Sequence, residues 1–536
     1  MINEVLRKHF QFNTFKMLDR IISTLLSLFS ALVMGTPRIS REVNDSRSAL
    51  EQDGQLNDTI YSEYALFGEE NVPSSRDYIE LGYEIESRRS YRQSFLRSLK
   101  ATLTIISAVV PLVIFGVILI YFDLRTIDLC FQWMIKSNNT LSFDVQRIRL
   151  LGNGIDAVVV NVLFPMFLAL LFGWKKFKSQ YSLTVLVGLL TALLYTLYLS
   201  FLLLYRVYDT SLWYRVPGNV LFAIAVIMES AIVVSKIRQC DPGISYPNLQ
   251  IFIIVAFPFF LAFAVAMFYR YALVYWFISL ENVLFRFIVA ITAPTLTLVL
   301  AVICRRMALR CSSQVVRPER SFALVYFIPA TGIVVYRIMQ ANFKNIWLFV
   351  GLCIVSGVSR VLKVATVNIR GKVWARIIEI SNKICCFTLH RSHEDTPHHR
   401  RLKADMNIQN ILFDSNSLIL SQAYIVLYHI TSFEMSAWTV LKSFFILTAI
   451  GLGIEIVFIF LATFIQIHWH NIPIARVWSK NWRRHVFGNG VVVIGVVTYF
   501  TKPLITVFQN RFQNNPVFGA KNYTIRNCTP SYKNWY

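Results

Sequence analysis

Charged residues are scarce in this sequence. Only 15% of its 536 residues are Asp, Glu, Lys or Arg, whereas 55% are hydrophobic and the mean hydropathy is +0.51. Because soluble globular domains carry about 25% charged residues, this composition excludes a chain built only from such domains. It indicates an integral membrane protein.

Acidic residues are scarcer than basic ones. The sequence has 30 Asp and Glu against 53 Lys and Arg, which gives a formal net charge of +23. In a soluble protein this excess would suggest nucleic-acid binding, but no helix-turn-helix, RRM or OB pattern accompanies it. Since the basic residues fall between apolar runs, we expect no nucleic-acid partner. We expect basic loops that contact membrane lipids at an anionic leaflet.

Cysteine is sparse too, with eight residues and no C-x-x-C pair. One basic loop nevertheless collects candidate zinc ligands: Cys385, Cys386, His390, His393, His398 and His399. Structural zinc sites usually have paired ligand spacing, which this loop lacks. We therefore expect no metal site and interpret the loop as solvated, with palmitoylation of its cysteines as an alternative.

The first hundred residues contain no apolar run of full span length. Residues 1–36 have a basic start and a short apolar run, which fits either a signal peptide or an anchor lying in the membrane plane. Residues 37–100 are polar and partly acidic, and we expect a mostly disordered tail. Its segments beginning at Tyr64 and Tyr78 have the tyrosine-x-x-bulky form of sorting signals, which a cytosolic adaptor would bind. A plain linker is the alternative.

Long apolar runs dominate the rest of the chain. Hydrocarbon offers no partner for backbone polar groups, so each run of about 20 residues is expected to form a spanning helix. We predict an all-α polytopic integral membrane protein, with a multispanning helical domain over 101–508 and a short tail over 509–536. The predicted spans are 101–122, 154–174, 181–205, 218–235, 249–269, 282–304, 321–340, 346–359, 411–433, 443–467 and 487–508. These bounds put Asp414 in the first turn of the ninth span. For Tyr271 to Leu280, a re-entrant segment is an alternative.

The basic loops give an orientation. The loops predicted to share one side, and to be cytoplasmic because they hold most of the Lys and Arg, are 175–180, 236–248, 305–320, 359–406 and 470–486. The N-terminus is then cytosolic and the C-terminus lumenal or extracellular, in the endoplasmic reticulum or another endomembrane, with the plasma membrane as an alternative. A cleaved signal in residues 1–36 would invert this orientation.

Two kinds of modification follow from the orientation. Asn138, Asn522 and Asn527 lie in sequons on the lumenal side and are candidate glycosylation sites. Cys130 and Cys528 are the cysteines placed on that side, so they form a disulfide or remain two free thiols.

Residues 359–383 mix apolar and basic side chains in the manner of an amphipathic helix at the cytoplasmic interface. Such a helix would shape a lateral doorway for lipid, or would only brace the bundle from its edge.

Several ionisable residues fall inside or near apolar spans: Asp156, Glu229, Arg286, Asp414, His429, Glu455 and Lys502. A charge at mid-membrane costs about 2.5–3.5 kcal/mol on insertion scales, so each should face protein or a watery cavity. A transporter or channel with a polar path through Glu229, Glu455 and Arg286 is one reading. Structural buried ion pairs are the other.

The stretch from Trp469 to His485 reads WHNIPIARVWSKNWRRH. Its tryptophans and Asn471 are similar to the tryptophan–asparagine loop of membrane-bound O-acyltransferases of the sterol and diacylglycerol branch. The part from Trp478 to Trp482 also resembles the aromatic signature of wax-synthase-like members. In both branches the loop is cytoplasmic and lies between spans, as predicted here.

The resemblance implies transfer of an acyl group from acyl-CoA, as co-substrate, to a lipid-like hydroxyl acceptor. The family's catalytic histidine follows the loop on an apolar helix, but span 487–508 holds no histidine, so His429 is the candidate base and Asn471 would orient the acyl donor. The candidate substrate-binding residues are Trp469, Arg476, Trp478, Lys480, Trp482, Arg483 and Arg484, whose cations suit the phosphates of coenzyme A.

Two readings without this chemistry remain. The same tryptophans and cations would form an aromatic belt and a topology anchor on an ordinary hairpin. The whole chain would then be a transporter, or a non-catalytic membrane scaffold whose tail recruits cytosolic partners.

Overall fold

The computed structural model describes residues 90–126, 143–205, 216–310, 315–343, 345–367, 369–370, 373, 376, 397–432 and 437–513. These belong to one compact unit, Glu80–Tyr536. Residues 1–36, most of the tail over 37–100, and the predicted features at Tyr64, Tyr78, Cys130, Asn138, Cys385, Cys386, Asn522, Asn527 and Cys528 lie outside the described residues.

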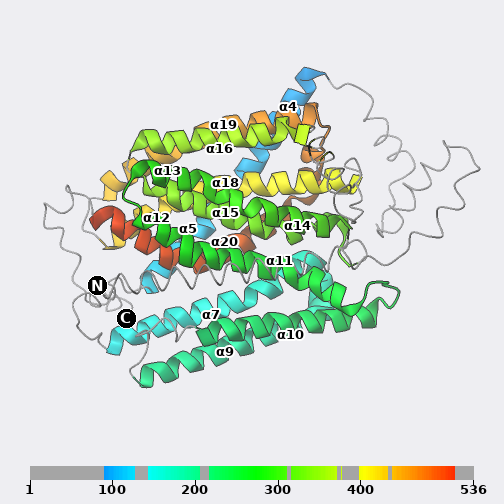
Figure 1. Cartoon of the computed structure of the whole chain (residues 1–536), viewed down its shortest axis with the longest axis vertical. Coiled ribbons are helices and arrows are strands. Elements are labelled where there is room, and N and C mark those ends of the chain that lie inside the picture. Colours follow the sequence, from blue (N-terminus) through cyan, green and yellow to red (C-terminus); the bar gives the residue numbers. More distant parts are fainter. Residues whose placement is uncertain are drawn as a thin grey trace, which may run out of the picture. The chain divides into compact units, whose positions relative to one another are not determined.

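The described part of the chain is helical and contains no strand (Figure 1). Its α-helices are α4 (Tyr91–Ser107), α5 (Val109–Thr126), α7 (Phe143–Phe172), α8 (Trp174–Lys176), α9 (Leu183–Leu204), α10 (Val216–Cys240), α11 (Asn248–Phe268), α12 (Val274–Ser279), α13 (Val283–Thr292), α14 (Leu296–Arg310), α15 (Ala323–Asn342), α16 (Ile346–Ala365), α18 (Pro397–Ser432), α19 (Ala437–His468) and α20 (Ile474–Gln513). Short 3-10 or π segments are η1 (Phe177–Tyr181), η3 (Tyr269–Leu273), η4 (Ala293–Thr295) and η5 (Pro318–Arg320).

Among the described residues, ten helical stretches are long and apolar enough to cross a membrane. They coincide with the first ten predicted spans, and the eleventh, 487–508, lies within α20. The prediction of an all-α polytopic membrane protein is confirmed.

Several predicted boundaries were wrong. Helix α11 continues through η3 and α12 to Ser279, so Tyr271 to Leu280 is the end of a span and not a re-entrant piece. Helix α18 begins at Pro397, which puts Asp414 near its middle instead of in its first turn. Helix α4 begins at Tyr91, inside the segment expected to be tail. In each case the helix extends beyond the most apolar window of the sequence.

Helix α18 is buried although it is polar. It packs against α5, α15, α19 and α20, and it lies between the α16–α19 pair and the group of α7, α9 and α10 (Figure 1). Ser415, Asn416 and Ser417 are buried in its middle. Helix α9, in contrast, exposes many leucines, as expected of a face in contact with lipid.

Local signals set several helix ends. Asn282 accepts a hydrogen bond from the Leu284 N–H (2.8 Å) and Asn345 accepts one from the Trp347 N–H (2.9 Å), as N-caps of α13 and α16. After α7, Gly173 has φ 86°, a conformation that favours glycine.

The five loops predicted to share one side do meet at one end of the bundle, which we call the loop end. Each contact below joins residues at or beside two of these loops. The contacts are Lys176 with Asp241, Gly173 with the guanidinium of Arg320, Arg305 with His399, and Glu319 with Arg484. Assignment of the loop end to the cytoplasm stays a prediction from charge.

Candidate functional site

Four charged side chains from four helices form a network in the middle of the bundle. Arg337 of α15 is ion-paired with Glu455 of α19, and its Nη2 atom lies 3.8 Å from Asp414 of α18. Asp414 also pairs with Arg360 of α16. The Arg337 side chain is fully buried, and those of the other three are at most 15% exposed. We call these four residues the charge network.

The charge network is formally neutral, with two cations and two anions. Neutrality matters because an isolated charge in hydrocarbon costs several kcal/mol, whereas a complementary set can offset part of that penalty. Replacing such a set by apolar residues is often neutral or stabilising, so stability alone does not explain why a bundle contains it. Buried ionisable groups in spans typically mark a functional path.

Polar neighbours fix Arg337 and tie α15 to α16. Arg337 Nη1 donates to Gln340 Oε1 (2.7 Å), and Gln340 Nε2 donates to the Phe349 carbonyl (3.2 Å) and lies 2.9 Å from Cys353 Sγ. The Tyr336 hydroxyl donates to the Leu352 carbonyl (2.5 Å). Arg337 is therefore held in one place instead of being able to move freely within the bundle.

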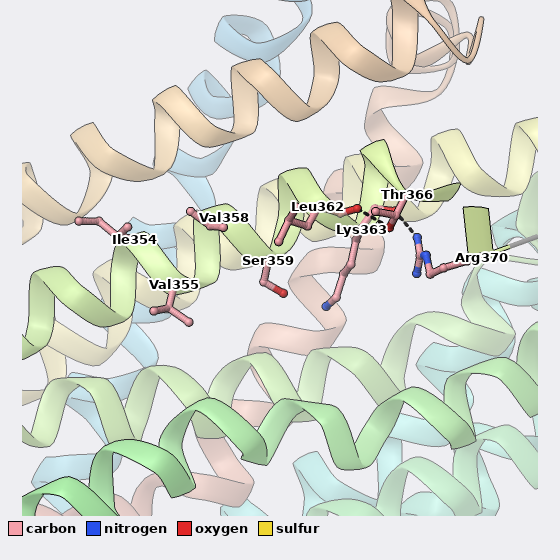
Figure 2. A pocket seen from close by; sticks show the side chains of 8 residues that line it. All are labelled: Ile354, Val355, Val358, Ser359, Leu362, Lys363, Thr366 and Arg370. Carbon is pink, nitrogen blue, oxygen red and sulfur yellow. Dashed lines mark hydrogen bonds between the residues drawn. The ribbon is translucent and has the colours of Figure 1, made fainter. Parts of the chain in front are cut away.

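A groove of about 440 Å³ runs along α16, the helix that carries Arg360. It is open on one side, and its lining side chains come from consecutive turns of α16 and from the segment after it (Figure 2). One part is apolar, with Ile354, Val355 and Val358, all exposed. Toward the loop end the lining also holds polar and basic side chains, those of Ser359, Lys363, Thr366 and Arg370, beside Leu362.

This groove bears on the prediction for residues 359–383. The first part of that segment continues α16 instead of starting a separate helix: α16 ends at Ala365, where the Thr366 N–H bonds to the Leu362 carbonyl. Of the predicted segment, Ser359, Leu362, Lys363, Thr366 and Arg370 line this groove, and its placement at the membrane interface stays a prediction.

A second buried network lies nearer the loop end. His485 of α20 and Asp405 of α18 are buried, and His485 Nε2 lies 3.2 Å from Asp405 Oδ1. Gln409 Nε2 lies 3.0 Å from both His485 Nδ1 and the His485 carbonyl. Donation from Gln409 to Nδ1 puts the ring proton on Nε2, beside the carboxylate. Asn489 extends the network to the hydroxyl of Tyr326 (3.2 Å).

Glu319 lies on the loop-end side of this second network and is connected to it through Arg401. Its carboxylate pairs with Arg484 at 2.8 Å and lies 4.0 Å from Arg401, and Arg401 in turn lies 3.9 Å from Asp405. The basic residues of the 470–486 loop are thus partly used in holding α18, α20 and η5 together.

The predicted acyltransferase loop is a tight turn followed by the start of α20. Asn471 has a positive φ of 47°, which asparagine tolerates better than most residues, and it ends the turn before Ile474. Trp469 and Trp482 are exposed, whereas Trp478 is buried near His485. Arg476, Lys480 and Arg483 are exposed, and Arg483 also lies over the ring of Trp482.

The structure does not bring His429 and Asn471 together. Asn471 is at the loop end, where α18 starts, while His429 is close to the other end of α18, which stops at Ser432. From Gln409, which contacts His485, to His429 is 20 residues of helix, or about 30 Å at 1.5 Å per residue. One site containing both residues does not fit this geometry.

The three residues of the predicted transporter path are also separated. Glu455 belongs to the charge network, and Arg286 donates to the carbonyls of Leu280 (2.5 Å) and Ile278 (3.2 Å) at the end of α12. Glu229 is buried among α7, α9 and α10. The signal that was overlooked is Arg337, an arginine inside an apolar run, which is as informative as the acidic residues that were singled out.

Asp405, Gln409 and His485 were also missed, because they lie just outside the most apolar windows. In the zinc-like loop, His398 lies 3.3 Å from the Ser321 hydroxyl and His399 lies 2.7 Å from Arg305. No cluster of three potential metal ligands occurs among the described residues. Comparison with protein-family models, with curated proteins and with solved structures gave no match.

Proposed function

We propose that the protein is a membrane transport protein that moves the polar part of an amphiphilic lipid across the bilayer along the α16 surface. The observation that carries the proposal is that α16 has the groove on one face and Arg360 of the charge network on another, inward face. An apolar groove that becomes basic toward one membrane face matches an acyl chain joined to an anionic headgroup.

The physical problem in lipid transfer is the headgroup. Moving a charged headgroup through hydrocarbon carries the same penalty as burying a charged side chain. Fixed charges of both signs reduce that penalty, because cations at Arg337 and Arg360 suit a phosphate and anions at Asp414 and Glu455 suit an amine. Lys363 and Arg370 provide cations at the groove's basic end.

Reconstitution tests this function. The full chain in liposomes containing a trace of fluorescent phospholipid should expose more of the inner-leaflet label to a membrane-impermeant quencher than protein-free liposomes do. We expect Lys363→Glu to slow this transfer at least tenfold, because it reverses the charge at the groove. Lys176→Glu is the matched control, since Lys176 is partly exposed and pairs with Asp241 away from the groove. Transfer no faster than in protein-free liposomes would remove the proposal.

A second candidate is the O-acyltransferase, which one observation favours. His485 is a buried histidine on the helix that follows the Trp469 turn, and Asp405 orients its ring. In that reading His485 replaces His429 as the base, acyl-CoA is the co-substrate and a lipid-like alcohol is the acceptor. Microsomes should then incorporate labelled acyl groups into lipid, and His485→Ala and Asn471→Ala should each abolish this. Incorporation by both variants at the wild-type rate would exclude it.

Localisation and modification belong to the same proposal. The basic loop end faces the cytosol, the N-terminal tail with Tyr64 and Tyr78 meets a cytosolic adaptor, and Asn138, Asn522 and Asn527 are glycosylated in the lumen of the endoplasmic reticulum. A disulfide between Cys130 and Cys528 would form on that side.

A further inference from the structure

Glu229 lies near the middle of α10 and is fully buried. Neither of its carboxylate oxygens has a hydrogen-bond partner among the described residues. This differs from Glu455, whose charge is matched by Arg337. A carboxyl group in such surroundings needs either a proton or a cation.

A second oxygen at this place is a backbone carbonyl that a proline leaves free. In α7 the residue four positions after Asn161 is Pro165. Proline has no N–H, so the Asn161 carbonyl lacks its usual helical donor. The side-chain oxygen of Asn161 is also buried without a hydrogen-bond partner, because the amide nitrogen is the atom that bonds, to the Ala157 carbonyl (2.8 Å).

Gly188 of α9 lies beside two of these oxygens, the Asn161 carbonyl oxygen and Glu229 Oε1. A Cβ atom on Gly188 would lie 2.7 Å from the Asn161 carbonyl oxygen and 3.3 Å from Glu229 Oε1. Both atoms therefore lie against the same glycine, and only a residue without a side chain allows these helices to approach so closely. Three helices contribute to the spot, and its polar atoms are oxygen acceptors.

We infer that Glu229 and the Asn161 backbone carbonyl, which both lie against Gly188, contribute oxygen ligands to a binding site for an alkali-metal cation. Oxygen ligands are what a hard cation prefers, and a helix carbonyl freed of its donor is a typical ligand at mid-membrane. A single carboxylate balances one positive charge, so a monovalent ion gives a neutral site, whereas a divalent ion would leave a net charge in low dielectric. A proton on Glu229 competes with the cation. The site uses α7, α9 and α10 and is independent of the α16 groove.

Binding of radioactive sodium to the purified full chain in lipid nanodiscs tests this inference. Ionic strength is held constant with choline chloride, and unlabelled Na⁺ and K⁺ are the competitors. We expect saturable binding that either alkali ion displaces and choline does not, and that weakens as the pH falls. Glu229→Gln should lose at least tenfold in affinity. Glu281→Gln, a change at an exposed acid, is the control and should bind normally.

Pro165→Ala gives a second variant that does not depend on removing a buried charge. It returns an N–H to the Asn161 carbonyl, so the helix should be at least as stable while cation affinity falls several-fold. The inference is overturned if the wild type binds no more than a choline-matched blank, or if Pro165→Ala binds sodium as tightly as the wild type does. Loss of binding in Pro165→Ala supports it even if Glu229→Gln does not fold.

Discussion

At the residue scale, the buried charged residues differ in whether they have an oppositely charged partner. Arg337 has two carboxylates within reach, Asp414 has two arginines, and Glu229 has no cation among the described residues. The free-energy cost of deleting one charge therefore depends mainly on whether its partner is left buried and unpaired, and less on the attraction that is lost. Single and double substitutions at one ion pair should therefore change the free energy of unfolding by very different amounts.

Glu455→Gln should destabilise the protein by about 3–5 kcal/mol, because it leaves Arg337 buried with Asp414 as its remaining anionic neighbour. The double variant Arg337→Met with Glu455→Leu should lose far less, since it removes both charges and keeps the volume. Denaturant unfolding in detergent measures both. Equal losses in the single and double variants would mean that Arg337 and Glu455 do not depend on one another.

At the element scale, close helix packing rests on small residues. Gly357 of α16 sits against the ring of Phe458 on α19, so that a Cβ atom would collide with it. Close approach through small residues is how helices associate in lipid, where apolar surface alone gives no preference for protein over lipid tails.

Gly357→Ala should therefore destabilise the α16–α19 pair by about 1–3 kcal/mol, as overpacking usually does. Gly453→Ala is the matched control on α19, because nothing lies within 4 Å of its Cβ position, and it should be neutral or stabilising by up to about 1 kcal/mol through helix propensity. The melting temperatures of the two variants, each compared with that of the wild type, measure these stability changes. A Gly357→Ala variant as stable as Gly453→Ala would contradict the predicted collision.

Hydropathy was sufficient to find the spans, but it did not find α18 in full. Its apolar window begins near Ile411, whereas the helix starts at Pro397 because other helices cover its polar first half. For the same reason Asp405 and His485 could not be paired from sequence: their contact depends on how α18 packs against α20. Glu455 and Asp414 were identified as intramembrane charges, but their partners required the packed structure.

At the scale of the whole molecule, charge asymmetry predicts which side of the membrane the loop end faces. The contacts joining Glu319 to Arg484 and Lys176 to Asp241 show which loops share an end, and the positive-inside rule then predicts that this end is cytoplasmic. The α16 groove becomes basic toward that same end. An anionic headgroup in the cytoplasmic leaflet would therefore meet Lys363 and Arg370 first.

Glycan mapping tests the orientation. Asn138, Asn522 and Asn527 should carry glycans that a glycosidase removes with a shift in gel mobility, and replacing each asparagine by glutamine should remove one step. Asn44 and Asn57, also in sequons, should stay unmodified. Glycans on Asn44 or Asn57 with bare C-terminal sites would reverse the assignment of the loop end.

The most direct measurement is lipid transfer in liposomes carrying the double variant Arg337→Met with Glu455→Leu. This variant keeps the packing of α15 and α19 but removes half of the charge network. We predict that it folds with near-normal stability and transfers labelled phospholipid at least tenfold more slowly than the wild type. A folded double variant that transfers lipid at the wild-type rate would contradict the claim that the charge network lowers the penalty for moving the headgroup.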